Sequence, residues 1–561
     1  MPGWNREVNQ TTIDGVPVIW AEAPGPIRAT LMFRVGRVDE RLPWSGITHL
    51  VEHLALFQLG PRQTYEFNGA VTSNRTMFYA TGQPADIVAF MAHVTAALSG
   101  LPFDRLDSEK SVLLAEASSR PVSPADLMFN LRFGARGNGL YRYKEFGLYH
   151  LTQPWVAAWA ARGFSRDNAV LWMSAPPPAD LHLALAAGQR MPEVPAIPIE
   201  LRLPAYVKAP VGGAGVSMLA PRSTPLAMAS SIASDRLLKR LRYDKGIAYS
   251  VGGGYFPIDS MQAHVSLWTD AQPGHAATVL NDTVQSVYAM GTAGPSAEEL
   301  AEQAGNFERS LERDEAVLAW LDRTAVRILN GEPAQHPDEL RAEMQAVTPA
   351  TARDAMAQAV RSAIYVGPGD VPPPPAIPAY VAPNPPPVQG EPHPHVQSRL
   401  WRHPPVLSVG GDGVTLTINA DDRITVYFES CEAMLQYGDG GILLVGADGA
   451  ELPVNPEEWL GGPVVVQQIV QRLPATLALP LPGETTVTAI KVPPPKARGG
   501  LAMAGIPIDR WIGLFVFVAV AVALLGFAIY GSRTSLGSTP PLVSLVVWAA
   551  LGYRLFRRFR F

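Results

Sequence analysis

The spacing of apolar and polar residues predicts an α+β unit over residues 12–187. Short apolar or alternating runs at residues 15–23 and 29–35 favour β-strands. Residues 46–56 are expected to form a buried helix, because apolar residues recur there at helical spacing and neither Gly nor Pro follows the first position. The pattern continues with a hairpin-like pair of strands and two helices, at residues 71–81, 85–98 and 107–119.

The same order of elements repeats after a Pro-rich connector. The predicted elements are a strand, a helix, two further strands and three helices, at residues 216–220, 225–243, 248–255 and 262–269 and from about residues 275, 297 and 316. The chain is therefore expected to hold two similar αβ units, residues 1–190 and 212–370, joined by a linker at 191–211.

Beyond the two units the pattern changes. Residues 371–398 contain runs of Pro and are expected to form an extended spacer. Short β-like runs separated by turn signals, and a final amphipathic segment at 464–473, predict a small β-rich domain over 399–475. This order of strands and a last helix resembles that of a pleckstrin-homology domain. A linker at 476–510 follows.

Two apolar segments follow, and they predict a transmembrane helical hairpin at 511–531 and 537–556. The alternative for the shorter second segment is that it only dips into the membrane interface. The first has no charged residue and is long enough to span a lipid bilayer. Basic residues flank the pair, whereas the loop between the segments has only Arg533; the flanking residues are Lys491, Lys496, Arg498, Arg510, Arg554, Arg557, Arg558 and Arg560. Because Lys and Arg accumulate on the cytoplasmic side, we expect a multi-pass protein of the cell membrane with residues 1–475 on the cytoplasmic side.

Composition excludes several classes of function. The net charge of -5 gives no footprint for nucleic-acid binding. Cys431 is the only cysteine, so no disulfide can form within the chain and a thiolate-based zinc site is excluded. No secretory signal is visible near the first residues, which agrees with the expected cytoplasmic side.

The predicted helix at 46–56 carries candidate chemistry. His49 and His53 lie one turn apart on one face, so both imidazoles could bind one ion, and Glu52 lies beside them. Zinc suits this pattern, because it lowers the pKa of its bound water to about 7, where a neighbouring base can act on it. The pattern His-x-x-Glu-His is that of inverzincins. The plain alternative is a helix that carries these residues by chance. A zinc site would also need a third ligand from elsewhere in the chain.

Glu109 and Glu116 lie in the predicted helix at 107–119. They are close to two helical turns apart, so both carboxylates lie on one face of the helix and could bind the same ion from different positions along it. One carboxylate would complete a nitrogen and oxygen ligand set for zinc. Such pairs are also common on solvated helices.

These motifs together resemble the pitrilysin, insulysin and mitochondrial processing peptidase family of zinc metallopeptidases. Residues 38–40, 69–79 and 164–170 resemble further landmarks in the same order, and the likeness covers roughly residues 10–370. The resemblance implies a Zn²⁺ ion held by three ligands, with Glu52 as catalytic base and Glu109 as a supporting carboxylate; the implied ligands are His49, His53 and Glu116. Two features depart from the family: a short interval between His53 and Glu116, and Gly69 where many members have Asn.

The second unit has no zinc motif, but it resembles the family at Arg242 and Tyr249. In the family an Arg and a Tyr of this kind contact substrate near the scissile carbonyl, and a guanidinium and a phenol suit a developing oxyanion. A surface Arg and a core Tyr are the plain alternatives.

The resemblance implies half of a clamshell peptidase that forms a homodimer, in which the second unit of one subunit completes the zinc site of another. We expect a membrane-anchored zinc endopeptidase that hydrolyses peptides or unfolded segments, with Glu52 assisting the attack of zinc-bound water. The peptide is expected to add as a strand beside residues 71–81. The alternative is a catalytically silent scaffold or partner subunit of a membrane-bound peptidase complex.

Overall fold

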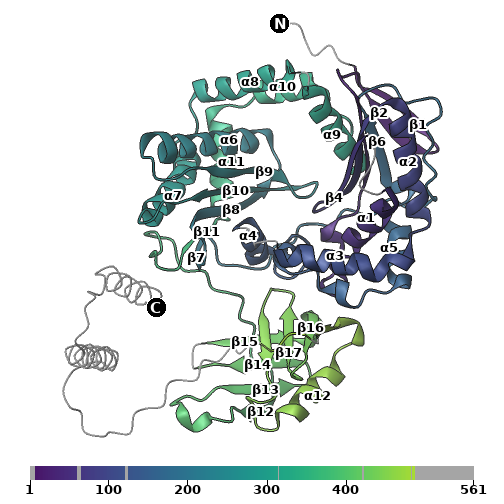
Figure 1. Ribbon diagram of the computed structural model, residues 1–561. Helices are drawn as coiled ribbons and strands as arrows, with labels where there is room; N and C mark the ends of the chain where they lie inside the picture. Colours follow the sequence, from purple (N-terminus) through teal and green to yellow (C-terminus); the bar gives the residue numbers. More distant parts are fainter. Residues whose placement is uncertain are drawn as a thin grey trace, which may run out of the picture. The chain divides into compact units, whose positions relative to one another are not determined.

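The computed structural model describes residues 7–59, 65–119, 124–313, 315–419, 422–481 and 483–486 (Figure 1). The predicted transmembrane segments 511–531 and 537–556 lie outside these residues. Among the helices that are described, none is by itself long and apolar enough to cross a membrane. One pair, Pro84–Ser99 with Phe103–Ala117, passes the same test only as a span bent by 78°.

The first sheet has six strands in the order β1-β2-β6-β3-β5-β4. Its strands are β1 Asn9–Ile13, β2 Val16–Trp20, β3 Ile27–Phe33, β4 Glu66–Val71, β5 Thr76–Gly82 and β6 Ala169–Met173. Strands β2 and β6 are parallel, and the other pairs are antiparallel. The hairpin expected at 71–81 begins earlier, because β4 starts at Glu66 and residues 72–75 form the turn. Strand β4 lies at an edge of the sheet.

Helices pack on one face of this sheet because their apolar stripes match its buried side chains. The helices are α1 Ile47–Leu56, α2 Pro84–Ser99 and α5 Gln153–Gly163, with α3 Leu106–Ser119 beside α1. Leu50 and Leu54 of α1 are fully buried against a core that includes Phe33, Phe78 and Phe90. The apolar side of α1 therefore packs into this core.

The second sheet repeats the topology of the first. Its order is β7-β11-β8-β10-β9, with β7 parallel to β11 as β2 is to β6. The strands are β7 Ala205–Ala209, β8 Gly213–Pro221, β9 Val251–Pro257, β10 Gln262–Asp270 and β11 Ile364–Pro368. The main helices of this unit are α6 Thr224–Leu238, α7 Ala276–Thr292, α8 Ala297–Leu311, α10 Pro337–Gln345 and α11 Pro349–Val360. The predicted α+β class with two similar units is confirmed.

Two local expectations for this unit need correction. The linker expected at 191–211 contains the strand β7. Pro204 and Pro210 flank this strand and favour irregular chain in a prediction from sequence, but proline is tolerated at the ends of a strand. The helix expected at 225–243 changes character at its end. There α6 stops at Leu238 and a π-helical turn, η8 Lys239–Asp244, follows.

Each unit contributes one helix to the sheet of the other. Helix α4 Pro124–Phe133 belongs to the first unit, but its Met128 packs with Ile364 and Val366 of the second sheet. Helix α9 Ala316–Leu329 belongs to the second unit, and its apolar residues pack on the first sheet; the contacting residues are Val317, Leu321, Ala325, Leu329, Ile19, Met32, Val170 and Trp172. Both sheets are therefore covered on two faces only when both units are present.

A buried polar cluster lies beneath α4. Arg132 donates from Nε to Ser217 Oγ (3.0 Å) and from Nη2 to the carbonyls of Ser217 and Ser362 (both 2.8 Å). The Ser217 hydroxyl in turn lies 2.8 Å from His264 Nε2. Burial, and then the charge of Arg132, lower the pKa of His264 to about 3. His264 is therefore neutral in the folded protein at physiological pH.

This cluster predicts a loss of stability in mild acid. The pKa of His264 is lowered below its ordinary value of 6.5 by folding, so its contribution is complete above pH 6.5 and is lost as the pH falls. Between pH 7 and pH 5 the loss should be about 2 kcal/mol. His264→Gln keeps a hydrogen-bonding side chain but does not titrate. Urea unfolding at both pH values should show a smaller acid loss in this variant, and equal losses would contradict the assignment.

The β-rich domain consists of two four-stranded sheets, β12-β13-β14-β15 and β18-β17-β16-β19. Its elements are β12 Gly390–Pro394, β13 Val406–Gly410, β14 Gly413–Thr417, β15 Arg423–Tyr427, β16 Cys431–Tyr437, β17 Ile442–Gly446, β18 Glu451–Val454, α12 Gly462–Arg472 and β19 Ala478–Leu481. Strand β12 lies in the expected spacer 371–398, and β19 lies beyond residue 475. The strands precede a helix as expected, but β19 follows the helix and pairs in parallel with β16.

Candidate metal centre

Helix α1 is held at its first turn by a buried carboxylate. Glu40 accepts hydrogen bonds from the backbone N–H groups of Gly46 (2.9 Å) and Thr48 (3.0 Å). Burial raises the pKa of Glu40 to about 7, although the charge of Arg37 and these hydrogen bonds oppose the shift, and the ionised form complements the helix dipole. Gly46 adopts φ 89°, a conformation that favours glycine, and thereby lets the chain enter the helix sharply. The direction of α1, and of the residues it carries, is fixed by these contacts.

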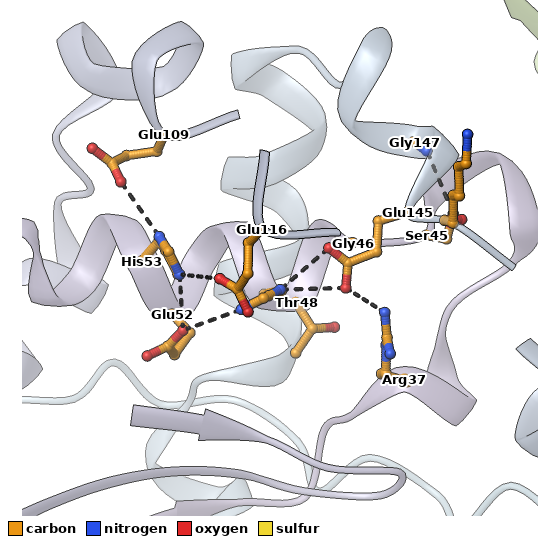
Figure 2. Close-up of polar contacts among 12 residues, drawn as sticks. Arg37, Ser45, Gly46, Thr48, Glu52, His53, Glu109, Glu116, Glu145 and Gly147 are labelled. Carbon is orange, nitrogen blue, oxygen red and sulfur yellow. Dashed lines mark hydrogen bonds and ion pairs between the residues drawn. The ribbon is translucent and has the colours of Figure 1, made fainter. Parts of the chain in front are cut away.

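The structure brings three of the predicted residues together. Ligand atoms of His49, His53 and Glu116 all lie within 4.8 Å of one another, and Glu116 belongs to α3. Figure 2 shows Glu116 beside His53 and Glu52. The Nε2 atom of His53 is 3.9 Å from an oxygen of Glu116. Glu52 has an oxygen 3.9 Å from Nε2 of both histidines. Glu52 is thus beside the cluster of three.

Carboxylates on the far side of each imidazole decide which nitrogen faces the cluster. His49 Nδ1 is 3.2 Å from Glu145 Oε2, and His53 Nδ1 is 3.4 Å from Glu109 Oε2. With Nδ1–H donating to a carboxylate, each neutral imidazole presents the lone pair of Nε2 to the cluster. Two imidazole nitrogens and one carboxylate oxygen are a donor set that fits zinc and leaves a position open.

Burial sets the electrostatics of the centre. It raises the pKa of Glu52 to about 7; the charge of Glu116 acts in the same direction and that of His49 opposes it. Burial lowers the pKa of His49, but the hydrogen bond and charge of Glu145 outweigh it and leave the pKa raised. In the metal-free protein Glu52 can therefore exchange a proton near neutral pH, the range in which a general base acts.

Gly69 of β4 makes room for Glu52. A Cβ atom at this position would lie 1.9 Å from Glu52 Oε1. The carboxylate of Glu52 therefore occupies the space that a side chain would fill. This contact gives a physical reason for glycine at a position where the resemblance leads one to expect Asn, and it places the open edge of the first sheet beside Glu52.

Two cavities lie near the cluster. The smaller, about 80 Å³, is lined by His49, Glu116 and Glu145. The larger, about 1070 Å³, does not reach the three ligand residues; it is lined by the turn at residues 72–75 and by parts of α4, α6, α9, β9 and β10. Asp126 and Tyr141 line both cavities. The small space beside the ligands therefore adjoins a space large enough for several peptide residues.

Arg242 and Tyr249 lie on the second unit, at η8 and just after it. Both are exposed, and the guanidinium carbon of Arg242 is 4.7 Å from the ring centre of Tyr249. Asp270 accepts hydrogen bonds from the backbone N–H groups of Tyr249 (2.9 Å) and Ser250 (2.7 Å), which fixes the loop. Within the residues that the structure describes, no hydrogen bond or ion pair joins Arg242 or Tyr249 to the ligand cluster.

Sequence reasoning missed Glu145 and the role of Glu40. Glu145 lies 96 positions after His49 and in a stretch without helical spacing, so no local pattern could connect it with the motif. Glu40 lay within a landmark of the resemblance, but its capping contacts depend on a turn between residues 41 and 45 that the apolar pattern does not predict.

No protein-family model matches the sequence, and no curated protein matches it. Solved structures do resemble the fold. A peptidase M16 inactive domain from Pseudomonas fluorescens has a TM-score of 0.55 at 14% identity, covering 66% of this chain and 99% of that one. A protease from Helicobacter pylori gives 0.52 at 14% identity, covering 64% and 99%. The first half of the periplasmic protease PqqL from Escherichia coli gives 0.53 at 14% identity, covering 66% and 93%.

About two thirds of the chain therefore have the fold of M16-like peptidase domains. At this level of identity the likeness concerns the fold alone, and one of the similar domains is described as inactive.

Proposed function

We propose that the protein is a zinc-dependent endopeptidase that hydrolyses peptides or unfolded segments. The observation that carries the proposal is the convergence of His49, His53 and Glu116 from two helices, with the buried carboxylate of Glu52 beside them. A scaffold that binds no metal would not require two imidazoles that carboxylates turn toward the same carboxylate ligand.

Each residue of the site has its own role in the proposed hydrolysis. His49, His53 and Glu116 would hold the zinc ion, which supplies Lewis acidity to water and to the scissile carbonyl when bound. Glu52 accepts a proton from the attacking water and returns it to the leaving amine. Glu145 and Glu109 keep the two imidazoles oriented.

The open edge of β4 supports an extended substrate. Among the strands that the structure describes, β4 pairs only with β5, so its other edge offers main-chain groups for hydrogen bonds. A peptide added there as a strand would lie beside Glu52, because Gly69 of β4 contacts that carboxylate. Extended or unfolded segments meet this requirement, whereas folded proteins do not.

A catalytically silent scaffold or partner subunit is the alternative, and the inactive domain with a similar fold favours it. Metal analysis and peptide cleavage decide between the two. The purified protein should contain about one zinc ion per chain and should cleave a mixed library of unstructured peptides. A chelator should remove both properties, and added zinc should restore them. Protein that binds no zinc and cleaves no peptide would be a scaffold.

We further propose a homodimer, because Arg242 and Tyr249 are exposed and are not joined to the cluster of their own chain. The guanidinium of Arg242 lies over the ring of Tyr249, and Asp270 fixes the loop that carries Tyr249. The guanidinium and the phenol can together donate hydrogen bonds to an anion. In a dimer these two groups could serve the carbonyl oxygen at the metal centre of a second subunit.

Membrane anchoring stays a proposal from the charge pattern of the sequence. With the peptidase on the cytoplasmic side, a cysteine at position 535 should react with an impermeant thiol reagent on intact cells after Cys431 has been replaced. A cysteine at position 398 should not react. Labelling at 398 would place the peptidase outside and contradict the assignment.

A further inference from the structure

The β-rich domain is docked on the first unit through a buried charge. Glu432 of β16 is an almost fully buried glutamate whose carboxylate accepts a hydrogen bond from Arg136 and lies 3.4 Å from Arg41. Both arginines belong to the first unit. A buried carboxylate needs such partners, because an unpaired charge would be costly in this environment. The pairing therefore ties β16 to two separate loops of the first unit.

Apolar and backbone contacts surround this charge. One cluster of buried residues combines side chains of both domains: Leu42, Ala135, Leu140 and Phe146 with Ala433, Leu435, Val445, Leu479 and Leu481. The backbone N–H of Ala135 donates to the carbonyl of Ala447 (3.1 Å). A Cβ atom on Gly134 would lie 2.1 Å from the same carbonyl oxygen, so the two chains approach as closely as glycine allows.

The docked segment, residues 134–149, also touches the metal centre. It contains two 3₁₀ turns, η5 Gly137–Arg142 and η6 Phe146–Tyr149. A Cβ on Gly147 would lie 2.6 Å from the Ser45 carbonyl oxygen, and a Cβ on Gly46 would lie 2.8 Å from the Cβ of Glu145. The segment is therefore packed against the first turn of α1 on one side and against the β-rich domain on the other.

Glu145 is the residue of this segment that reaches the cluster. Its carboxylate pairs with Arg37, as Figure 2 shows, and it also pairs with Nδ1 of His49. Short 3₁₀ turns have poorer hydrogen-bond geometry than α-helices, so their position depends on what they pack against.

We propose that the β-rich domain positions the metal centre: by docking through Glu432 it holds segment 134–149 in place, and Glu145 in that segment orients His49. Glu432 and Glu145 are positioning residues in this scheme. The inference rests on the proposed function for its effect on zinc, whereas the docking itself does not depend on any activity.

Charge reversal in the full-length protein tests the proposal. Glu432→Arg places a cation against Arg136 and Arg41, and Arg136→Glu places a carboxylate against Glu432. Each should raise hydrogen exchange of backbone amides in residues 135–149 of the metal-free protein about tenfold and should weaken zinc binding about tenfold. The double variant, with the charges exchanged, should regain part of both properties. Glu429→Arg, at an exposed glutamate of the same domain, is the matched control and should change neither.

The outcomes separate the two ideas. Unchanged exchange in both single variants would overturn the docking role, and faster exchange with unchanged zinc affinity would overturn the link to the metal centre. Failure of the double variant to regain protection would show that the single variants act by misfolding and would also overturn the proposal. If the wild-type protein binds no zinc, the proposed function fails, while the exchange measurements still decide whether the β-rich domain orders segment 134–149.

Discussion

Glu52→Gln is expected to lower peptide hydrolysis by about a thousandfold while the protein keeps its zinc, since a general base contributes on the order of 10²–10⁴ in rate. Glutamine has the same size as glutamate but cannot accept a proton from water. Zinc should stay because the three converging ligand atoms belong to His49, His53 and Glu116. The measurements are kcat on an unstructured peptide and the zinc content per chain.

Two further variants make this result specific. Glu116→Gln should lose zinc and activity together, because it removes the carboxylate ligand. Glu298→Gln is a suitable control, since Glu298 is an exposed glutamate of helix α8, away from the proposed catalytic and substrate-binding residues. If Glu52→Gln cleaves peptides at a near wild-type rate, the proposed role of Glu52 is wrong.

Mixing two inactive variants is expected to restore activity. In a homodimer with shared sites, a Glu52→Gln chain still supplies Arg242, and an Arg242→Ala chain still supplies Glu52. Each mixed dimer then contains one intact composite site, and random assortment should return about a quarter of wild-type activity. Activity is measured after the two purified variants have been mixed and allowed to exchange subunits.

As a reference for subunit exchange, each variant is also mixed with wild-type chains. Different tags on the two kinds of chain show that mixed dimers have formed. Absence of any recovery in mixed dimers would place Arg242 and Tyr249 in the site of their own chain or outside catalysis. Full activity of Arg242→Ala by itself would place Arg242 outside catalysis.

The two-unit fold could be predicted because its signals are local. Helix α1 and the helices α2 and α3 follow from apolar spacing within single segments, and the repeated order of elements predicts the second sheet. Proline misled the prediction at β7 and β12, since it suggested a connector and a spacer where it flanks or enters strands at the edge of a sheet. The helix exchange of α4 and α9 could not be predicted, because each helix looks from its sequence as if it packed on its own unit.

The residues of the candidate site also fall into two groups, those that sequence patterns predict and those that only the folded structure brings near. His49, Glu52 and His53 share one helix, so their spacing is visible in the sequence, and Glu116 could be proposed from the resemblance. Glu145 comes from a stretch without periodicity and reaches His49 only through tertiary packing. The support of that stretch by Glu432 depends on a domain to which the sequence assigned no chemistry.

The exchange of α4 and α9 has a consequence for how the protein can be divided. A fragment that ended before β7 would contain every proposed zinc ligand, but α9 would be missing and the side chains of Ile19, Met32 and Val170 would face water. The complementary fragment would lack α4 and would expose Ile364 and Val366. Contiguous apolar surface of this kind promotes aggregation. The two units can therefore not be expected to fold apart from each other, and gene truncations that separate them should give insoluble protein.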